Sequence, residues 1–313
     1  MSLLFRLLGR LPLRLLHALG ALFGWAAFLA SPTYRRHTKE NLALAYGPAE
    51  AAAILPGAVA HAGRGVLELP YLWTRPKAEV LGLVREATGW ELVEAALLRG
   101  DGLLFFTPHL GCFEITAQYI AVRTPITVLY RRPKQAWLQP FIESGRGGGA
   151  NLHLAPADLS GVRLLLKALK RHEAAGMLPD QVPGMGEGRW ADFFGRPAYT
   201  MTLGARLSET GRTTVLLVYA ERLPGGRGYN LRFSAPTQPI AGTQEERVTA
   251  INRTLEDLIR NCPQQYLWGY NRYKAPRGAE ASTHPPSPAP GAGMTAVRGQ
   301  GPLREGGPAE PPC

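Results

Sequence analysis

Residues 101–120 of the chain read DGLLFFTPHLGCFEITAQYI. The apolar run Leu103–Phe106 predicts a buried strand, and the Thr-Pro pair after it predicts the strand's end. His109 follows in the turn, and Glu114 comes five positions later, where the pattern predicts the first turn of a helix. The segment therefore predicts a strand–turn–helix unit with two chemically active side chains beside the strand's carboxyl end.

The same alternation continues on both sides of this unit. Apolar runs at 126–130 (ITVLY) and 213–220 (TTVLLVYA) predict two more strands. The segments 160–172 and 243–261 place apolar residues at helical spacing along one stripe, which predicts amphipathic helices. Residues 40–100 read as helices with interruptions at Gly47, Pro48 and Pro56. We therefore expect a single α/β domain with a mostly buried central mixed sheet flanked by helices.

The composition excludes several classes of protein. The chain has 313 residues, and its three cysteines are far apart, which excludes a disulfide scaffold and a CxxC zinc site and favours a reducing compartment. None of the seven histidines stands at a ligand-pair spacing, so no metal or cofactor is predicted. The net charge of +11 favours an anionic partner: nucleic acid, phospholipid head groups, a phosphorylated substrate or an acidic carrier protein. Because no basic patch with interleaved stacking aromatics is visible, no nucleic-acid partner is predicted.

The chain divides into three parts. Residues 1–36 contain an uncharged stretch, Leu15–Ala30, with arginines on both sides, which predicts a membrane anchor or interfacial helix; a buried core helix is the alternative. Residues 37–274 form the α/β domain. Residues 275–313 hold nine of the 27 prolines and almost no large apolar residue, which predicts a disordered tail.

His109 and Glu114 form a candidate catalytic pair. Five positions along one continuous helix are about 140° apart, so the two side chains meet only if His109 lies in the turn and Glu114 in the first helical turn. A carboxylate that accepts from one ring nitrogen fixes the tautomer and leaves the other nitrogen free as a base. In the alternative interpretation His109 caps a turn and Glu114 is a solvated acid at a helix N-terminus. A third has Cys112 as nucleophile and His109 as its base.

Several segments resemble a known family. The segment TPHLGCFE resembles the H-x4-D/E motif of the lysophospholipid acyltransferase superfamily, and specifically of its lipid A biosynthesis acyltransferases. Further segments resemble that family's conserved blocks in the same order: TVLYRRPKQAWL (127–138), ESGRGGGANL (143–152), LPDQVPGMGEGRWADFFGRPAYTMT (178–202) and CPQQYLWGYNRYK (262–274). The resemblance covers roughly residues 5–275. The doubled arginine at 131–132 and the Pro/Gly tail depart from the family pattern.

The resemblance implies an O-acyltransferase without a cofactor. His109 would take the proton of a lipid A precursor's hydroxyl as that oxygen attacks an acyl thioester, and Glu114 would hold the imidazole. The implied partners are the thioester of acyl carrier protein or coenzyme A, a phosphorylated glycolipid acceptor and an anionic membrane surface. The implied location is the inner membrane of a Gram-negative bacterium, with the catalytic domain on the cytoplasmic side.

Four residues of the resembling blocks are candidates for binding substrate. Arg146 matches the family's arginine for an oxyanion or a substrate phosphate, or else lies in a flexible basic loop. Arg131 or Arg132 would grip a phosphate, with a solvated pair as the alternative. Asp180 would bind acceptor hydroxyls or fix a catalytic arginine, or else cap a turn. Three aromatic residues would shape an acyl channel or belong to the core: Trp190, Phe193 and Phe194.

Other functions stay open at this point, because the H-x4-E motif serves only the shared hydroxyl chemistry. One is acyl transfer to a lysophospholipid or to another glycolipid or amino-acid lipid. A second is a lipid or thioester hydrolase that depends on Cys112. A third is a non-catalytic, membrane-docked subunit that retains the fold.

Overall fold

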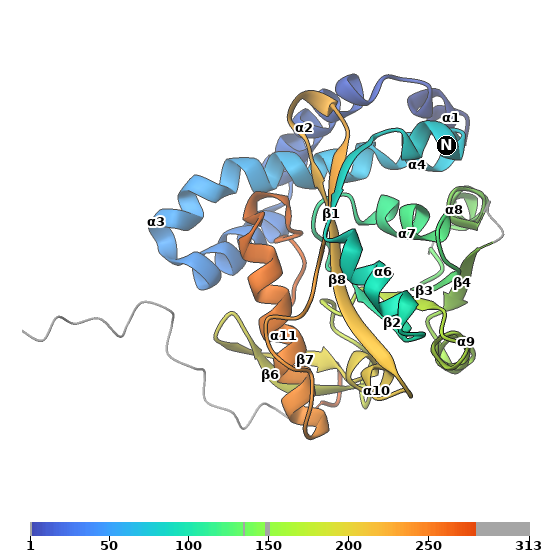
Figure 1. Ribbon diagram of the computed structural model, residues 1–313. Helices are drawn as coiled ribbons and strands as arrows, with labels where there is room; N and C mark the ends of the chain where they lie inside the picture. The colour runs from blue at the N-terminus through green and yellow to red at the C-terminus, as the bar shows by residue number, and fades with distance from the viewer. Residues whose placement is uncertain (1, 134, 148–150, 280–313) are drawn as a thin grey trace, which may run out of the picture.

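Helices cover both faces of a central sheet in the computed structural model, which describes residues 2–133, 135–147 and 151–279 (Figure 1). The helices are Ser2–Gly9 (α1), Leu13–Ala30 (α2), Pro32–Leu67 (α3), Leu69–Thr74 (α4), Lys77–Leu81 (α5), Trp90–Leu98 (α6), Phe113–Ala121 (α7), Gln139–Gly147 (α8), Leu159–Lys170 (α9), Leu203–Ser208 (α10) and Gln244–Arg260 (α11). The strands are Val84–Thr88 (β1), Gly102–Phe106 (β2), Ile126–Tyr130 (β3), Leu152–Pro156 (β4), Ala174–Met177 (β5), Gly188–Phe193 (β6), Arg196–Met201 (β7), Thr213–Arg222 (β8) and Tyr229–Ser234 (β9). Short 3-10 turns lie at Ala136–Leu138 (η1), Pro224–Gly226 (η2) and Pro263–Gln265 (η3).

The sheet has seven strands in the order β1-β9-β8-β2-β5-β3-β4. The strands from β8 to β4 are parallel, β9 is antiparallel to β8, and β1 is parallel to β9. The mixed sheet, the three predicted strands and the two predicted amphipathic helices are confirmed. The expectation of helices over 40–100 is wrong at β1, which lies at the sheet's edge with exposed residues and so lacks the apolar run of a central strand.

Alternate residues of the strands feed two hydrophobic cores, one on each face of the sheet. In β2, Leu104 and Phe106 pack on the face covered by α9, α10 and α11, and Leu103 and Phe105 pack on the face covered by α4 and α7. Because β2 is central and covered on both faces, all five of its residues are buried. This rigid centre carries the loop that contains His109.

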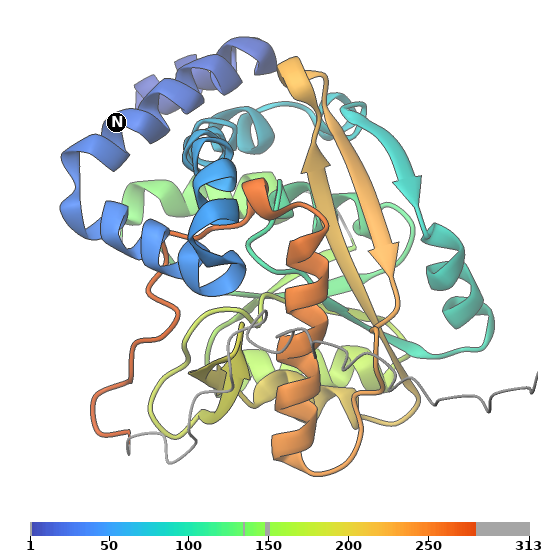
Figure 2. The same ribbon diagram turned by 90° about the vertical axis from the view of Figure 1, so that its left-hand side faces the viewer.

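The N-terminal helices lie at the carboxyl end of the parallel strands. Figures 1 and 2 show α2 and the turn between β8 and β9 at the same end of the molecule, and Arg14 of α2 contacts Gly226 in that turn. By length and composition two stretches, Leu13–Ala30 and Pro32–Thr74, are apolar enough to cross a membrane. Many apolar side chains of α1 and α2 are exposed, among them Leu3, Leu4, Leu7, Leu15, Leu19, Leu22, Phe23, Trp25 and Leu29.

Helices α2 and α3 approach each other through glycines. A Cβ atom at Gly63 of α3 would collide with the backbone of Gly20 and Gly24 in α2. Helix α3 itself is kinked at Gly47, whose φ of 74° is outside the helical range, as the predicted interruption there requires. The predicted division at residue 36 falls inside α3, and the predicted tail lies outside the described residues from residue 280 onward.

We expect Gly63→Leu to force α2 and α3 apart and to lower the free energy of unfolding by about 1–3 kcal/mol or more, as overpacking does. Ala52→Leu is the matched control, because Ala52 is exposed on the same helix. Thermal unfolding in detergent measures both. Equal melting temperatures for the two variants would contradict close packing at Gly63.

Candidate active site

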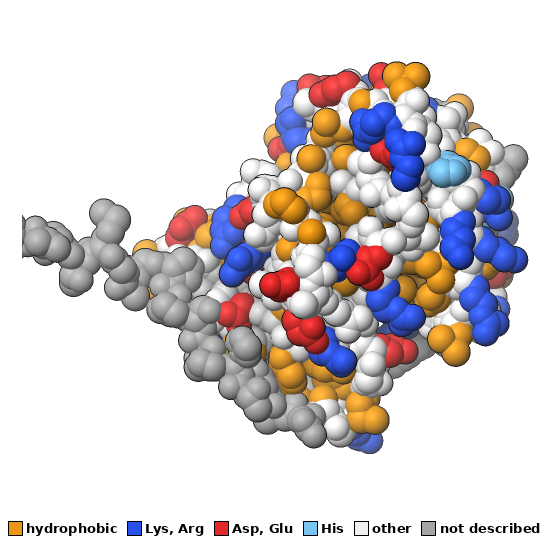
Figure 3. All heavy atoms as spheres, turned by 60° about the horizontal axis from the view of Figure 1, so that its bottom comes forward, with side chains coloured by type: hydrophobic (Ala, Val, Ile, Leu, Met, Phe, Trp, Pro, Cys, Tyr) orange, Lys and Arg blue, Asp and Glu red, His pale blue; other side chains and the backbone are white. Residues whose placement is uncertain are grey.

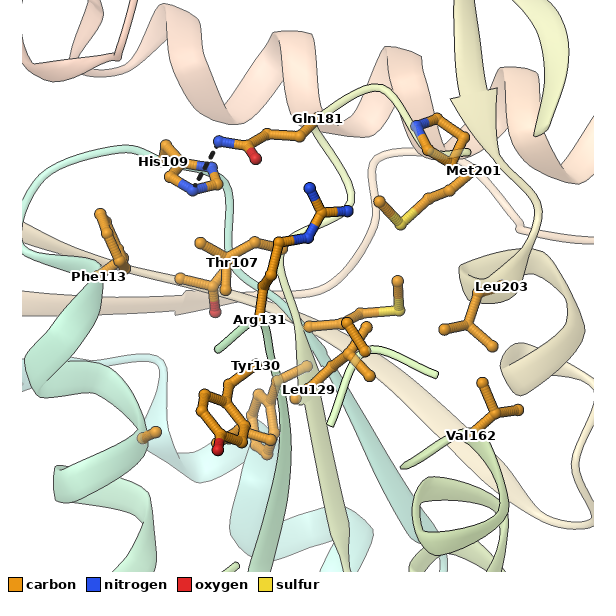
Figure 4. Close-up of a pocket in the computed structure, with 18 of the residues that line it drawn as sticks. Thr107, His109, Phe113, Leu129, Tyr130, Arg131, Val162, Gln181, Met201 and Leu203 are labelled. Atoms are coloured by element: carbon orange, nitrogen blue, oxygen red, sulfur yellow. Dashed lines mark hydrogen bonds between the residues drawn. The ribbon is translucent and has the colours of Figure 1, made fainter. Parts of the chain in front are cut away.

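His109 lies in the loop between β2 and α7, at the carboxyl edge of the sheet. The strand ends at Phe106, and the helix begins at Phe113, so His109 lies in the turn and Glu114 in the first helical turn, as predicted. The imidazole is mostly buried, with 17% of the side chain exposed, and it packs edge-on against the ring of Phe113. His109 also lines a cavity at this edge of the sheet (Figure 4).

Asp180 contacts both the imidazole and the backbone of His109. Its Oδ1 lies 2.8 Å from Nδ1 of His109, and its Oδ2 accepts the backbone N–H of the same residue at 2.9 Å. This contact with His109 differs from the roles expected for Asp180, which were to bind acceptor hydroxyls, to fix a catalytic arginine or to cap a turn. Strands β2 and β5 are parallel neighbours, so the loops after them meet at one edge of the sheet.

The electrostatics of the pair favour a charged carboxylate. Burial works against the ionised form of Asp180, but the attraction of His109 and its two hydrogen bonds outweigh burial, so the pKa of Asp180 lies below its usual range. A carboxylate can only accept, which assigns the ring proton to Nδ1 and leaves a lone pair on Nε2. The side-chain amide of Gln181 donates to that nitrogen at 3.1 Å (Figure 4). The arrangement presents Nε2 as a proton acceptor.

Glu114 is buried and lines the same cavity as His109. A hydrogen bond reaches its Oε2 from Nε1 of Trp73 in α4, at 3.1 Å. Trp73, like Gln181, is a site residue that sequence analysis did not single out. The predicted pairing of Glu114 with His109 stays a prediction. At Nδ1 of His109 the structure has a contact with Oδ1 of Asp180.

The cavity has a volume of about 640 Å³ and is lined mainly by apolar side chains on both sides of the sheet's carboxyl edge. One wall comes from α4, α7 and the adjacent strands: Trp73, Phe105, Ile120, Ile126, Val128 and Gly176. The other comes from α9, α10 and the strand ends: Leu129, Val162, Met177, Met201 and Leu203. Figure 4 shows His109 and Gln181 above the strand ends, with Phe113 and Tyr130 to one side and Leu203 and Val162 to the other. The cavity fits an extended apolar ligand whose reactive group lies at His109.

The three arginines predicted to bind substrate, Arg131, Arg132 and Arg146, differ in their positions relative to the cavity. Arg131 follows β3 and lines the cavity, whereas Arg132 is exposed and lies outside the cavity lining. Arg146 belongs to the last turn of α8 by its backbone, and its side chain is outside the described part of the structure. Within the described residues, no cluster of His, Cys, Asp and Glu could hold a metal ion.

The structure disfavours Cys112 as a nucleophile. Its side chain is buried, with 1% exposed. Burial raises the pKa of the thiol well above its usual range, and the nearby carboxylate of Glu68 raises it further. Because the thiolate is the reactive form, burial and the raised pKa both disfavour nucleophilic attack by Cys112.

The aromatic residues considered for an acyl channel lie elsewhere. Phe193 and Phe194 are fully buried in the core beneath α11, at the turn of the β6–β7 hairpin. Trp190 packs edge-on against Tyr199 of the same hairpin. The channel interpretation was wrong for these three residues, because the cavity is lined by β2, β3 and β5 and the helices beside them.

A family model for bacterial lipid A biosynthesis acyltransferases matches residues 2–275. The chain belongs to this family. Two relatives in Escherichia coli (strain K12) are 26% identical: a lipid A biosynthesis lauroyltransferase over 68% of this chain and 69% of its own length, and a lipid A biosynthesis palmitoleoyltransferase over 71% and 72%. A lipid A biosynthesis acyltransferase of Haemophilus influenzae is 25% identical over 84% of this chain and 86% of its own length.

The lowered pKa of Asp180 has a consequence for stability. A carboxylate whose pKa is lower in the folded than in the unfolded state stabilises the fold above its unfolded value of about 4, and that contribution is lost as the pH falls through the folded value. We expect the wild-type protein to be more stable than Asp180→Asn at pH 7, with the difference shrinking below about pH 4. Urea unfolding from pH 7 to pH 3 measures it. A difference of equal size at both pH values would contradict the stabilised carboxylate.

Proposed function

We propose that this protein transfers a fatty acyl group from an acyl thioester to a hydroxyl of a lipid A precursor, with His109 as general base. The observation that carries the proposal is the Asp180-bound imidazole at the edge of an apolar cavity, in a chain of the lipid A acyltransferase family. The names of the relatives support the acceptor class.

The chemistry needs no covalent enzyme intermediate. The acceptor hydroxyl replaces Gln181 at Nε2 of His109, gives its proton to that nitrogen, and attacks the thioester carbonyl. The C–S bond then breaks, and the leaving thiolate takes the proton back from the imidazolium. Asp180 keeps the Nδ1 proton in place and stabilises the cation formed during attack. Arg131 at the cavity supports binding of a phosphate or of the developing oxyanion.

The donor is acyl carrier protein or coenzyme A as a thioester, and its acyl chain occupies the apolar cavity. Glu114, the partner of His109 in the predicted dyad, remains a second carboxylate at this site. Its hydrogen bond from Trp73 supports a role in fixing the start of α7 and the loop before it. Replacing each carboxylate by the amide of the same size distinguishes the contributions of Asp180 and Glu114 to kcat.

His109→Gln is expected to lower kcat by about 10²- to 10⁴-fold, because general-base assistance is worth that much. Asp180→Asn is expected to lower kcat by about 10²-fold or more, since the wrong tautomer then becomes available. Glu114→Gln is expected to have the smallest effect of the three. The assay follows acyl transfer by mass spectrometry, with purified protein in detergent, an acyl carrier thioester and a lipid A precursor.

Cys112→Ala is the control and should keep activity within a few-fold. Full activity of His109→Gln would refute the base, and loss of turnover in Cys112→Ala alone would favour the cysteine hydrolase. Absence of transfer by the wild-type protein with every tested pair of substrates would favour a non-catalytic subunit. Mass spectrometry of the host's lipid A, with and without this protein, tests the same acyl transfer in cells.

Gly176 of β5 offers a test of the acyl cavity. A Cβ atom there would lie 3.2 Å from Cγ1 of Val128 and 3.5 Å from Cδ1 of Ile126. We expect Gly176→Val to shorten the cavity and to raise KM for the longest accepted donor about tenfold, with less effect on shorter donors. Thr127→Val, on the opposite face of β3, is the control. An unchanged chain-length profile would place the acyl chain elsewhere.

We further propose that α1 and α2 dock on the cytoplasmic side of the inner membrane. Their exposed apolar side chains lie beside Arg6, Arg10 and Arg14, a combination that suits an anionic lipid surface. On the opposite end of the molecule basic and acidic side chains are mixed (Figure 3). The membrane-facing surface therefore lies at the end that holds the active site.

Leu22→Glu with Phe23→Glu is expected to weaken binding to vesicles of phosphatidylethanolamine and phosphatidylglycerol at least tenfold, because two exposed apolar side chains of α2 are lost from the interface. Leu98→Glu is the matched control, since Leu98 is 89% exposed on α6. Vesicle flotation measures both. Equal binding by the two variants would contradict docking through α2.

A further inference from the structure

The loop that carries His109 is tied to two segments distant in sequence. The backbone N–H of Leu267 donates to the carbonyl of His109 at 3.1 Å. The N–H of Gly111 donates to the carbonyl of Gln265 at 3.1 Å, and that of Cys112 donates to Ala220 at 2.8 Å. The backbone of this loop is therefore fixed by the segment 265–267 and by the end of β8.

Arg222, the last residue of β8, makes a further hydrogen bond to this loop. Its Nη2 donates to the carbonyl oxygen of Gly111 at 2.8 Å, and the residue is 5% exposed. Gln265 clamps Arg222 from the other side: its Oε1 accepts the N–H of Arg222 at 2.8 Å and its Nε2 donates to the carbonyl at 3.1 Å. Gly111 has a φ of 59°, and a Cβ there would collide with the carbonyl of Ala220, so the loop has little freedom to adjust.

The charge of Arg222 is balanced by Glu68, at the junction of α3 and α4. The guanidinium donates to both carboxylate oxygens, with Nη2 2.6 Å from Oε1 and Nε 3.0 Å from Oε2. The hydroxyl of Tyr229 donates to Oε2 at 2.9 Å. Glu68 is 1% exposed, so the pair lies away from water, where such contacts are strong and their loss is costly.

The hydrogen bonds around Glu68 extend to α2. Nε2 of His17 in α2 lies 3.1 Å from Oε2 of Glu68, and His17 is 5% exposed. The opposite face of α2 carries the exposed Leu15 and Leu19. A continuous chain of contacts thus runs from α2 through Glu68 and Arg222 to the loop of His109.

We propose that Arg222 is a positioning residue for His109, and that His17 and Glu68 make the N-terminal helix part of the same support. The proposal rests on the proposed function. Arg222 touches no substrate-binding wall; it acts by fixing the carbonyl of Gly111, two residues from the base. A displacement of about 1 Å in a catalytic group can cost on the order of 10²-fold in rate.

The experiment compares Arg222→Lys, Glu68→Gln and Tyr229→Phe with Asp101→Asn. Lysine keeps the charge but cannot reach Glu68 and Gly111 with one planar fork. Asp101 is the control, because it is a buried carboxylate paired with Arg99, Arg212 and Thr214 at the opposite edge of the sheet. Melting temperatures show how far each variant is destabilised.

We expect Arg222→Lys and Glu68→Gln to lower kcat at least tenfold at temperatures where they are folded, to shift the pH profile of kcat, and to change KM less than threefold. Tyr229→Phe should show the same pattern more weakly, which covers the case in which the charged variants fail to fold. Asp101→Asn should lose stability without a change in kcat or pH profile. Unchanged kcat and pH profile in the folded Arg222 and Tyr229 variants would overturn the proposal.

A second readout does not depend on catalysis. The Nδ1 proton of His109, bonded to Asp180, gives a proton resonance in a sample with ¹⁵N-labelled histidine. It should shift or broaden in Arg222→Lys and Tyr229→Phe and stay in place in Asp101→Asn. A shifted resonance in a protein without transferase activity would refute the proposed function and keep the positioning role; an unshifted resonance would refute the positioning role.

Discussion

The hydrogen bond between Asp180 and His109 depends on the pairing of β2 with β5. The two strands are parallel neighbours in register, from Leu103 beside Ala174 to Phe106 beside Met177, so the chain leaves both at the same height. One loop then supplies the imidazole and the other the carboxylate that contacts it. If β2 and β5 were not neighbours, His109 and Asp180 would lie apart and the site would not form.

The proposed function requires a site that excludes water and admits lipid. The apolar cavity lies over the carboxyl edge of the sheet, and the N-terminal helices with their exposed leucines lie at the same end of the molecule (Figures 1 and 2). This arrangement suits the long-chain substrate of the proposed function. Because Asp180 is buried, it stabilises an imidazolium more strongly than an exposed acid would.

Much of the fold follows from local pattern. Central strands such as β2 and β3 are covered on both faces and read as short apolar runs, and α9 and α11 bury one stripe of a helical repeat. Strand β1 carries no such signal, because it lies at the sheet's edge and obtains its pairing from β9, more than 140 residues later. The aromatic residues Phe193 and Phe194 were equally ambiguous, since the same ring suits a core or a channel.

For the site, the sequence by itself determined the candidate imidazole of His109, its place between a strand and a helix, and the family, because these depend on residue type and on spacing within a short segment. The tertiary structure decided that Asp180 contacts Nδ1, that Gln181 meets Nε2, that Glu114 accepts from Trp73, and that Cys112 is buried beside Glu68. Each of these contacts joins segments whose distance is set by strand order and helix packing. The spacing of His109 and Glu114 along the chain cannot show that Asp180, which follows a different strand, contacts the imidazole.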